Sequence, residues 1–165
     1  DDMADTRLII VGGKPAEDAE LQRLEALAER LGIGDSTTFT GAVGQEDLRK
    51  YYNASDVFVL PSYYESFGLA ALEAMACGTP VVVSRVGGLS SFVEEGRTGY
   101  LIPWRCPEPF AERIRTLLAN PDLREAMGVV AREKSLKMTW GGVAERIAEL
   151  YCRLTDTSRQ LAAGA

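Results

Sequence analysis

The chain has 165 residues, a length that predicts one domain able to bury its own hydrophobic core. Apolar residues make up 46% and charged residues 25%, which argues against disorder, and the net charge of −6 argues against binding a nucleic-acid phosphate backbone. The sequence contains no histidine, which excludes within it every histidine nucleophile pair, general base and metal ligand.

Short apolar runs alternate with helical patterns through the first two thirds of the chain. The runs predict strands, and the intervening stretches predict helices because their apolar residues recur every three or four positions. The expected strands are 8–11, 37–40, 57–60, 81–83 and 99–102, and the expected helices between them are 21–31, 46–53 and 68–77. Because strands alternate with helices, we expect parallel β-α-β units.

After Pro103 the pattern is entirely helical, with expected helices at 110–118, 121–137 and 143–154 and a frayed tail over 155–165. The strands are continuous runs rather than alternating ones, so helices should cover both faces of the sheet. The predicted fold class is therefore α/β: a Rossmann-like, doubly wound parallel sheet of about five strands with C-terminal helices. The run at Leu8–Val11 is expected to be a buried strand.

In such sheets ligands bind beyond the carboxyl ends of the strands, which directs attention to the loops that follow them. Gly12-Gly13-Lys14 is neither a P-loop nor a dinucleotide fingerprint, and we interpret it as a tight turn. Gly87-Gly88 is interpreted as a plain turn, with close approach to a phosphate as the alternative.

The segment Pro61 to Gly78 differs from the other loops because it combines two carboxylates with a buried helix start. The helix from Gly68 is apolar on all sides except for Glu73, and an unpartnered buried carboxylate costs several kcal/mol. Glu73 should therefore be buried and contact something polar, either backbone or Arg85, or the hydroxyls of a ribose diol. Glu65 either complements the helix macrodipole or binds sugar hydroxyls. The amides from Ser66 to Leu69 have no intrahelical acceptor and could bind a diphosphate.

The stretch Glu65 to Glu73, ESFGLAALE, resembles the E-x7-E motif of family-4 glycosyltransferases, which are retaining enzymes of the GT-B fold. The resemblance continues in EAMACGTPVV, VGGL and GRTGYLIP, and upstream in FTGAV and ASDVFVLPS, and it covers residues 7 to 154. It implies that residues 1–154 are the C-terminal nucleotide-sugar-binding domain, or half of a GT-B fold.

The resemblance also implies roles for individual residues. Glu73 would hold the ribose diol, and Glu65 would be the catalytic-site carboxylate that binds the transferred sugar near its anomeric carbon. The backbone amides that follow Glu65 would donate to the sugar hydroxyls and the phosphate; they belong to Ser66, Phe67, Gly68 and Leu69. Gly41 and Val43 would border the base. The family needs no metal and no cofactor, and its donor is a UDP-, GDP- or ADP-sugar.

Two departures from the family pattern bear on activity. In the family an N-terminal domain holds the acceptor and usually carries a catalytic histidine, and neither is represented here. The first strand of the donor domain is also not represented, nor are the Arg and Lys that follow it, and neither Lys14 nor Arg85 is assigned their role. In the strand order 3-2-1-4-5-6 that first strand lies centrally. We expect the segment at Leu8–Val11 to pair directly with Val57–Leu60 and the last helix to present an exposed apolar stripe. Because the half that positions the acceptor is not represented, this chain alone should transfer no sugar.

Two other functions are compatible with parts of this pattern. The main alternative is a stand-alone sugar-nucleotide-binding or interaction module without transferase activity. A sugar-nucleotide epimerase is disfavoured because such sites depend on histidine. The expected partners are a nucleotide-sugar and the missing N-terminal domain, with no nucleic acid and no transmembrane segment, and self-association is left open.

The three widely spaced cysteines disfavour a disulfide framework and favour a reducing compartment. We therefore expect a cytoplasmic location, with peripheral membrane association through the missing domain left open.

Overall fold

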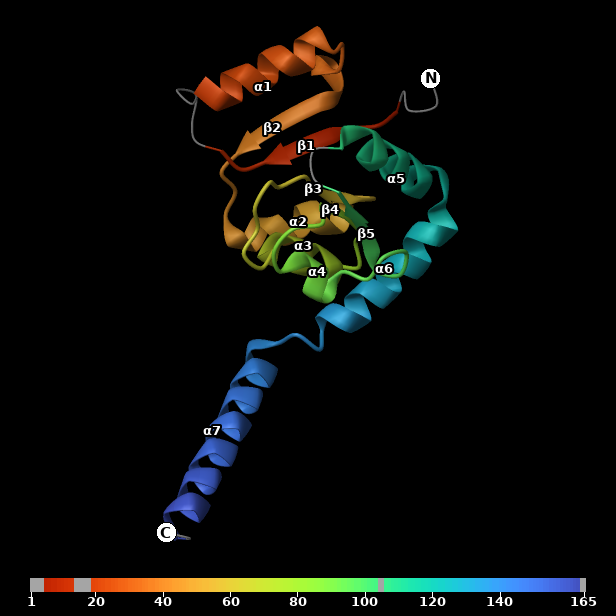
Figure 1. Cartoon of the computed structure of the whole chain (residues 1–165). Helices are drawn as coiled ribbons and strands as arrows, with labels where there is room; N and C mark the ends of the chain where they lie inside the picture. The colour runs from red at the N-terminus through yellow and green to blue at the C-terminus, as the bar shows by residue number, and fades with distance from the viewer. Residues whose placement is uncertain (1–4, 14–18, 104–105, 164–165) are drawn as a thin grey trace. The chain divides into compact units, whose positions relative to one another are not determined.

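A computed structural model describes residues 5–13, 19–103 and 106–163 of the chain, which pack as two compact units, residues 1–51 and 52–165. The first unit contains β1 (Leu8–Val11), α1 (Ala19–Arg30), the 3₁₀ turn η1 (Gly34–Ser36), β2 (Thr37–Gly41) and most of α2 (Gln45–Ala54) (Figure 1). The second contains β3 (Phe58–Leu60), α3 (Leu69–Ala76), β4 (Val81–Ser84), α4 (Leu89–Phe92), β5 (Gly99–Ile102), α5 (Pro107–Ala119), α6 (Pro121–Ser135) and α7 (Trp140–Ala163).

The strands form two parallel sheets. In one, β1 pairs with β2 from Leu8 opposite Thr37 onward, and in the other the order is β3-β4-β5. The predicted α/β class with parallel strands and C-terminal helices is confirmed. The predicted pairing of Leu8–Val11 with Val57–Leu60 is wrong for the described residues. The described backbone of Leu8–Val11 pairs with β2, and that of β3 pairs with β4.

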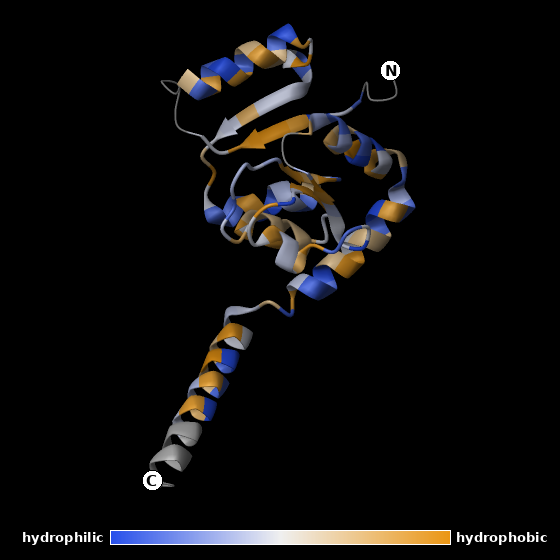
Figure 2. Cartoon of the chain, in the orientation of Figure 1, coloured by the Kyte–Doolittle hydropathy of each residue, from blue (hydrophilic) through white to orange (hydrophobic). Residues whose placement is uncertain are grey.

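The strand β1 is also more exposed than its apolar sequence predicts. Leu8 and Ile9 retain 44% and 46% of their accessible surface, and Figure 2 shows the strand as a hydrophobic element. Because β1 is paired in its unit only with β2, the expectation of a fully buried strand is wrong.

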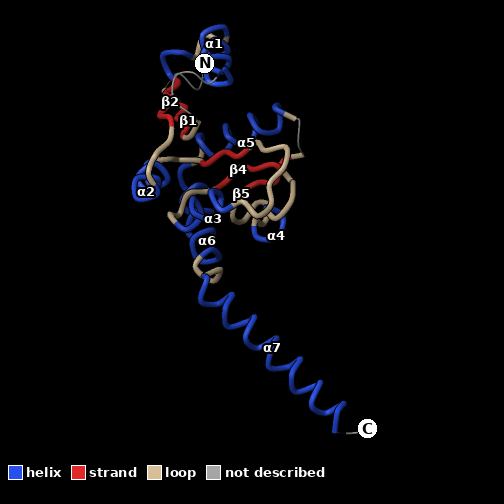
Figure 3. Tube along the Cα trace, turned by 90° about the vertical axis from the view of Figure 1, so that its left-hand side faces the viewer, coloured by secondary structure: helices blue, strands red, loops and turns tan. Residues whose placement is uncertain are grey.

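The core lies in the second unit, where every residue of β4 is buried. Figure 3 shows α5 on one side of β4 and β5 and α3 with α4 on the other, so helices cover both faces as predicted. One cluster joins the sheet to α5 and α6 and comprises Val82, Tyr100, Ile102, Phe110, Leu117 and Met127. The helix α6 packs closely on the end of α3, since a Cβ added at Gly128 would lie 2.1 Å from the Gly78 carbonyl oxygen.

The last helix differs from its prediction at one end. It continues to Ala163 instead of giving way to a frayed tail at Thr155, and the closing residues Arg159 to Ala163 are good helix formers. The predicted exposed stripe is confirmed over the part of α7 whose side chains are described, where the large exposed apolar residues are Trp140, Ile147, Leu150, Tyr151 and Leu154. Figure 2 shows hydrophobic residues recurring along this helix. Within the described part of the chain, no helix has the length and apolar character needed to cross a membrane.

Candidate functional site

The segment Glu65–Gly68 enters α3 through a left-handed glycine. Gly68 has φ 96° and ψ 47°, and its carbonyl accepts the first helical hydrogen bond, from the Leu72 amide at 3.1 Å. The amides at the start of α3 therefore have no acceptor within the helix, and the positive end of the helix dipole lies there. Glu65 and Phe67 are half-buried, and the Phe67 ring lies 5.3 Å from that of Phe92. This geometry gives the segment amide donors beside a carboxylate.

The loop Gly87-Gly88 supports this segment from within the protein. The Gly88 amide donates to the Ser66 carbonyl at 3.1 Å. A Cβ at Gly87 would lie 1.6 Å from the Glu65 carbonyl oxygen, and a Cβ at Gly88 would lie 2.7 Å from the Phe67 Cα. The glycine pair is therefore required because backbone approaches backbone. This contact accounts for the two glycines without the phosphate approach weighed from the sequence.

Leu89 continues the same support at the helix start. A Cβ at Gly68 would lie 2.4 Å from a terminal carbon of Leu89, and Leu89 is fully buried. The left-handed backbone and the packing both require glycine at position 68. The conformation of the whole E-x7-E start is thus determined by α4 and the loop before it.

Glu73 lies in the middle of α3, half-buried rather than buried as predicted. Its neighbours on the helix, Ala71, Ala74 and Met75, are fully buried. The Tyr52 hydroxyl at the end of α2 donates to Glu73 Oε2 at 3.0 Å. Burial raises the pKa of Tyr52, and the hydrogen bond to Glu73 and its charge raise it further, so the phenol stays protonated as the donor.

Arg85, a candidate partner for Glu73, contacts other groups. Its guanidinium donates to the Leu101 carbonyl at 3.2 Å and lies 3.6 Å from Glu95, which itself accepts from the Leu101 amide at 2.8 Å. These contacts brace the end of β5. Lys14, the other basic residue weighed, lies outside the described residues.

The residues predicted to border the base belong to the first unit. Gly41 ends β2 with φ 68°, and its carbonyl accepts from the Gly12 amide at 2.8 Å, which forms an isolated bridge beyond β1. The tight turn predicted at Gly12-Gly13-Lys14 extends into residues outside the described part of the chain and stays a prediction. Val43 follows as a half-buried residue. Their part in base recognition remains a prediction.

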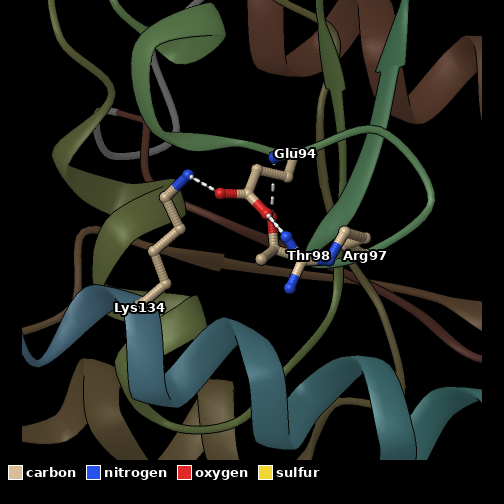
Figure 4. A network of polar contacts seen from close by, with 4 residues as sticks. All are labelled: Glu94, Arg97, Thr98 and Lys134. Atoms are coloured by element: carbon tan, nitrogen blue, oxygen red, sulfur yellow. Dashed lines mark hydrogen bonds and ion pairs between the residues drawn. The ribbon is translucent and has the colours of Figure 1, made fainter.

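A polar network centred on Glu94 joins the loop before β5 to α6 (Figure 4). Glu94 accepts from Lys134 at 2.5 Å and from Arg97 at 2.7 Å, and its amide donates to the buried Thr98 hydroxyl at 2.8 Å. The hydrogen bond from Lys134 and its charge lower the pKa of Glu94 against a smaller effect of desolvation. The network stabilises the GRTGYLIP turn, and the sequence offered no signal for the contact across 40 residues.

Two functional contacts were not predicted from the sequence. Tyr52 lies in the predicted helix 46–53 and Leu89 in the VGGL motif, but neither pattern predicts a contact with the segment from Glu65 to Glu73. A tyrosine facing inward from a short amphipathic helix was the only available signal for the first. Among the described residues, no group of three or more acidic or cysteine side chains could hold a metal ion, and metal independence stays a prediction.

Comparison with known proteins places this arrangement in a family. The sequence model of the family "Glycosyl transferases group 1" matches residues 2–134, and the chain belongs to that family. Over 145 residues it is 43% identical to the D-inositol 3-phosphate glycosyltransferase of Corynebacterium jeikeium, covering 87% of this chain and 35% of that protein. The chain thus spans about a third of the length of the curated relatives it matches.

Solved structures agree with this assignment. The sucrose-phosphate synthase of Thermosynechococcus elongatus superimposes with a TM-score of 0.82 at 40% identity, over 92% of this chain and 39% of that one. The HepE protein of Anabaena, in complex with UDP-glucose, superimposes with a TM-score of 0.78 at 25% identity, over 92% of this chain and 43% of that one.

Proposed function

We propose that residues 7–154 are the donor-binding half of a retaining glycosyltransferase that transfers a hexose from a nucleotide-sugar. The observation that carries the proposal is the E-x7-E segment at the start of α3, with Glu65 in a loop buttressed by Gly87-Gly88 and Glu73 bound by Tyr52. Family membership and the UDP-glucose complex of Anabaena HepE support it.

Each residue of the segment has a role that its environment suits. Glu73 would accept the two hydroxyls of the ribose, since one carboxylate offers acceptors to both. Glu65 would bind the transferred sugar beside its anomeric carbon. The amides of Ser66 to Leu69 would donate to the diphosphate, where the helix dipole favours negative charge. Gly41 and Val43 would border the base.

The proposed chemistry needs no metal, and this chain supplies no histidine to it. The bond from the anomeric carbon to the phosphate oxygen breaks, and a bond to the acceptor oxygen forms on the same face, which retains the configuration. The leaving diphosphate takes the acceptor's proton. The amides at the start of α3 would stabilise the charge that develops on this leaving group, and preorganised donors of this kind often supply the largest share of catalysis.

The comparisons suggest which probes to use. UDP-glucose is the donor bound by Anabaena HepE, and D-inositol 3-phosphate is named for the relative from Corynebacterium jeikeium. The N-terminal half that would hold the acceptor corresponds to the part of these relatives that the chain does not span.

The donor role is tested by calorimetry with UDP-glucose, ADP-glucose and GDP-glucose on the chain and on Glu73→Gln. Glu73→Gln should weaken binding of the preferred donor by about 1–3 kcal/mol, the usual range for a hydrogen bond to a charged group. Glu133→Gln, an exposed helical glutamate of α6, is the matched control and should bind normally. Equal affinity of Glu73→Gln and the parent chain would refute the diol role.

A transferase assay tests whether sugar transfer requires the acceptor-binding half in addition to the donor-binding half. Holding an acceptor against the donor contributes ~7–11 kcal/mol of barrier lowering, so the purified chain should form no glycosylated product from UDP-glucose and D-inositol 3-phosphate. Slow hydrolysis of the donor is compatible with the proposal. Turnover onto the acceptor at ordinary enzymatic rates would contradict it.

A further inference from the structure

We propose that Tyr52 is a positioning residue for donor binding: its hydroxyl orients the Glu73 carboxylate toward the ribose diol. This inference rests on the proposed function, because it assigns a source to the orientation that the diol role requires. It adds to the E-x7-E segment a residue from the preceding helix, 21 positions upstream of Glu73.

The first support is the way in which Tyr52 is held. Its side chain is 8% exposed, and its ring meets that of Phe58 edge-on at 5.7 Å. Its carbonyl accepts from the Thr79 hydroxyl at 2.7 Å, and Thr79 is itself 3% exposed. The ring is therefore fixed by contacts that do not involve its hydroxyl, and the hydroxyl at its end is a fixed donor.

The second support is the environment of Glu73. A glutamate has three side-chain torsions, and a directional hydrogen bond at its carboxylate restricts them. The 3.0 Å bond from Tyr52 supplies a directional contact at one oxygen. A carboxylate oriented before the ligand arrives loses less side-chain freedom on binding, and its acceptors already lie where the hydroxyls will be.

A purely structural role makes a different prediction. If Tyr52 only joined α2 to α3, loss of its hydroxyl would weaken every ligand of the site to the same extent. If it orients Glu73, the loss falls only on ligands whose ribose hydroxyls contact Glu73. The two readings separate when the hydroxyls are removed from the nucleotide rather than from the protein.

The experiment measures the affinity of UDP and of 2′,3′-dideoxy-UDP for the chain and for Tyr52→Phe by calorimetry. Phenylalanine keeps the ring and its contact with Phe58 and removes only the hydroxyl. We expect Tyr52→Phe to weaken UDP about 5- to 20-fold and the dideoxy nucleotide less than 2-fold, because a less well oriented carboxylate loses only part of its hydrogen bonding to the diol. Equal weakening of both nucleotides, or none of either, would overturn the inference.

Two further variants make the result independent of folding effects. Thr98→Val removes a hydrogen bond from the Glu94 amide to a buried hydroxyl, and this bond involves neither Tyr52 nor Glu73. It should therefore lower thermal stability without changing the ratio of the two affinities. A change in that ratio equal to the change in Tyr52→Phe would overturn the inference. The ratio of the affinities for UDP and for the dideoxy nucleotide should be no lower in the double variant Tyr52→Phe/Glu73→Gln than in Glu73→Gln. The Tyr52 hydroxyl acts through Glu73, so its loss should have no further effect on this ratio once Glu73 is replaced.

Glu73→Gln separates the failure of this inference from failure of the proposed function. If Glu73→Gln lowers the affinity for UDP and not for the dideoxy nucleotide, the diol role stands and Tyr52→Phe alone decides the inference. If Glu73→Gln affects both nucleotides equally, the diol role is wrong and the positioning role is wrong with it.

Discussion

Substitution of Gly87 by alanine tests whether the E-x7-E loop depends on the close approach of a second backbone. Gly87 has φ 49°, and an added Cβ would lie 1.6 Å from the Glu65 carbonyl oxygen. Gly96 is the matched control, since it has φ 70° and an added Cβ there meets nothing within 4 Å. Both variants introduce the same side chain in a left-handed backbone, and only Gly87→Ala also introduces an overlap.

The left-handed conformation costs alanine ~1–2 kcal/mol at either site. At Gly87 the two backbones must also separate by roughly 2 Å to restore an ordinary contact of ~3.5 Å. That movement combines overpacking, ~1–3 kcal/mol, with loss of the Gly88 to Ser66 hydrogen bond, ~0.5–1.5 kcal/mol. We therefore expect Gly87→Ala to be destabilised by about 2–4 kcal/mol more than Gly96→Ala.

The assay is denaturant unfolding of both full-chain variants, followed by calorimetry with UDP and UDP-glucose. The displaced loop carries Glu65, so Gly87→Ala should lose the part of the affinity that depends on the sugar. The amides of Ser66 to Leu69 lie in the same loop, so binding of UDP through its diphosphate should fall as well, and binding of UDP-glucose should fall further. Equal stabilities for the two variants, together with equal preference for UDP-glucose over UDP, would refute the argument that the glycine pair holds the loop.

Three further predictions concern titration and the last helix. The pKa of Glu94 is lowered from 4.5, so its contribution to stability is present above that pH and lost as pH falls through the lowered value. Lys134→Met should weaken this acid dependence, with Arg97 retaining part of it, and an unchanged acid unfolding curve would contradict the prediction. The pKa of Tyr52 is raised from 10.0, so its contribution is fully present below pH 10 and lost above it; alkaline unfolding should be less steep in Tyr52→Phe, and identical curves would count against a buried donor. Ile147 and Leu150 are each 46% exposed, so replacing both by serine should lower the unfolding free energy by no more than ~0.5 kcal/mol per site. A larger loss of unfolding free energy in denaturant unfolding would mean that the stripe is packed.

The order and type of the elements, except for the short η1 and α4, were readable from the sequence because they depend on neighbours along the chain. Runs such as Val81–Val83 predict strands by their β-branched residues, and the prolines at 107 and 121 lie in the first turns of α5 and α6. The isolated Glu73 in an apolar helix predicted a polar partner by the cost of leaving it unpaired. Family resemblance then followed from the same local motifs.

What the tertiary structure decided were the partners of these residues. The sequence predicted that Glu73 needs a donor, but only the folded chain brings the Tyr52 hydroxyl to it. It contained the Gly87-Gly88 pair, but the reason for two glycines lies in the backbone of Glu65 to Phe67, which the fold places against them. Strand pairing is the same kind of question: Leu8–Val11 has strand character by itself, yet its neighbour is determined by register and crossover geometry. Local propensity selects an element within a few residues, whereas contacts between distant residues exist only once the chain has folded.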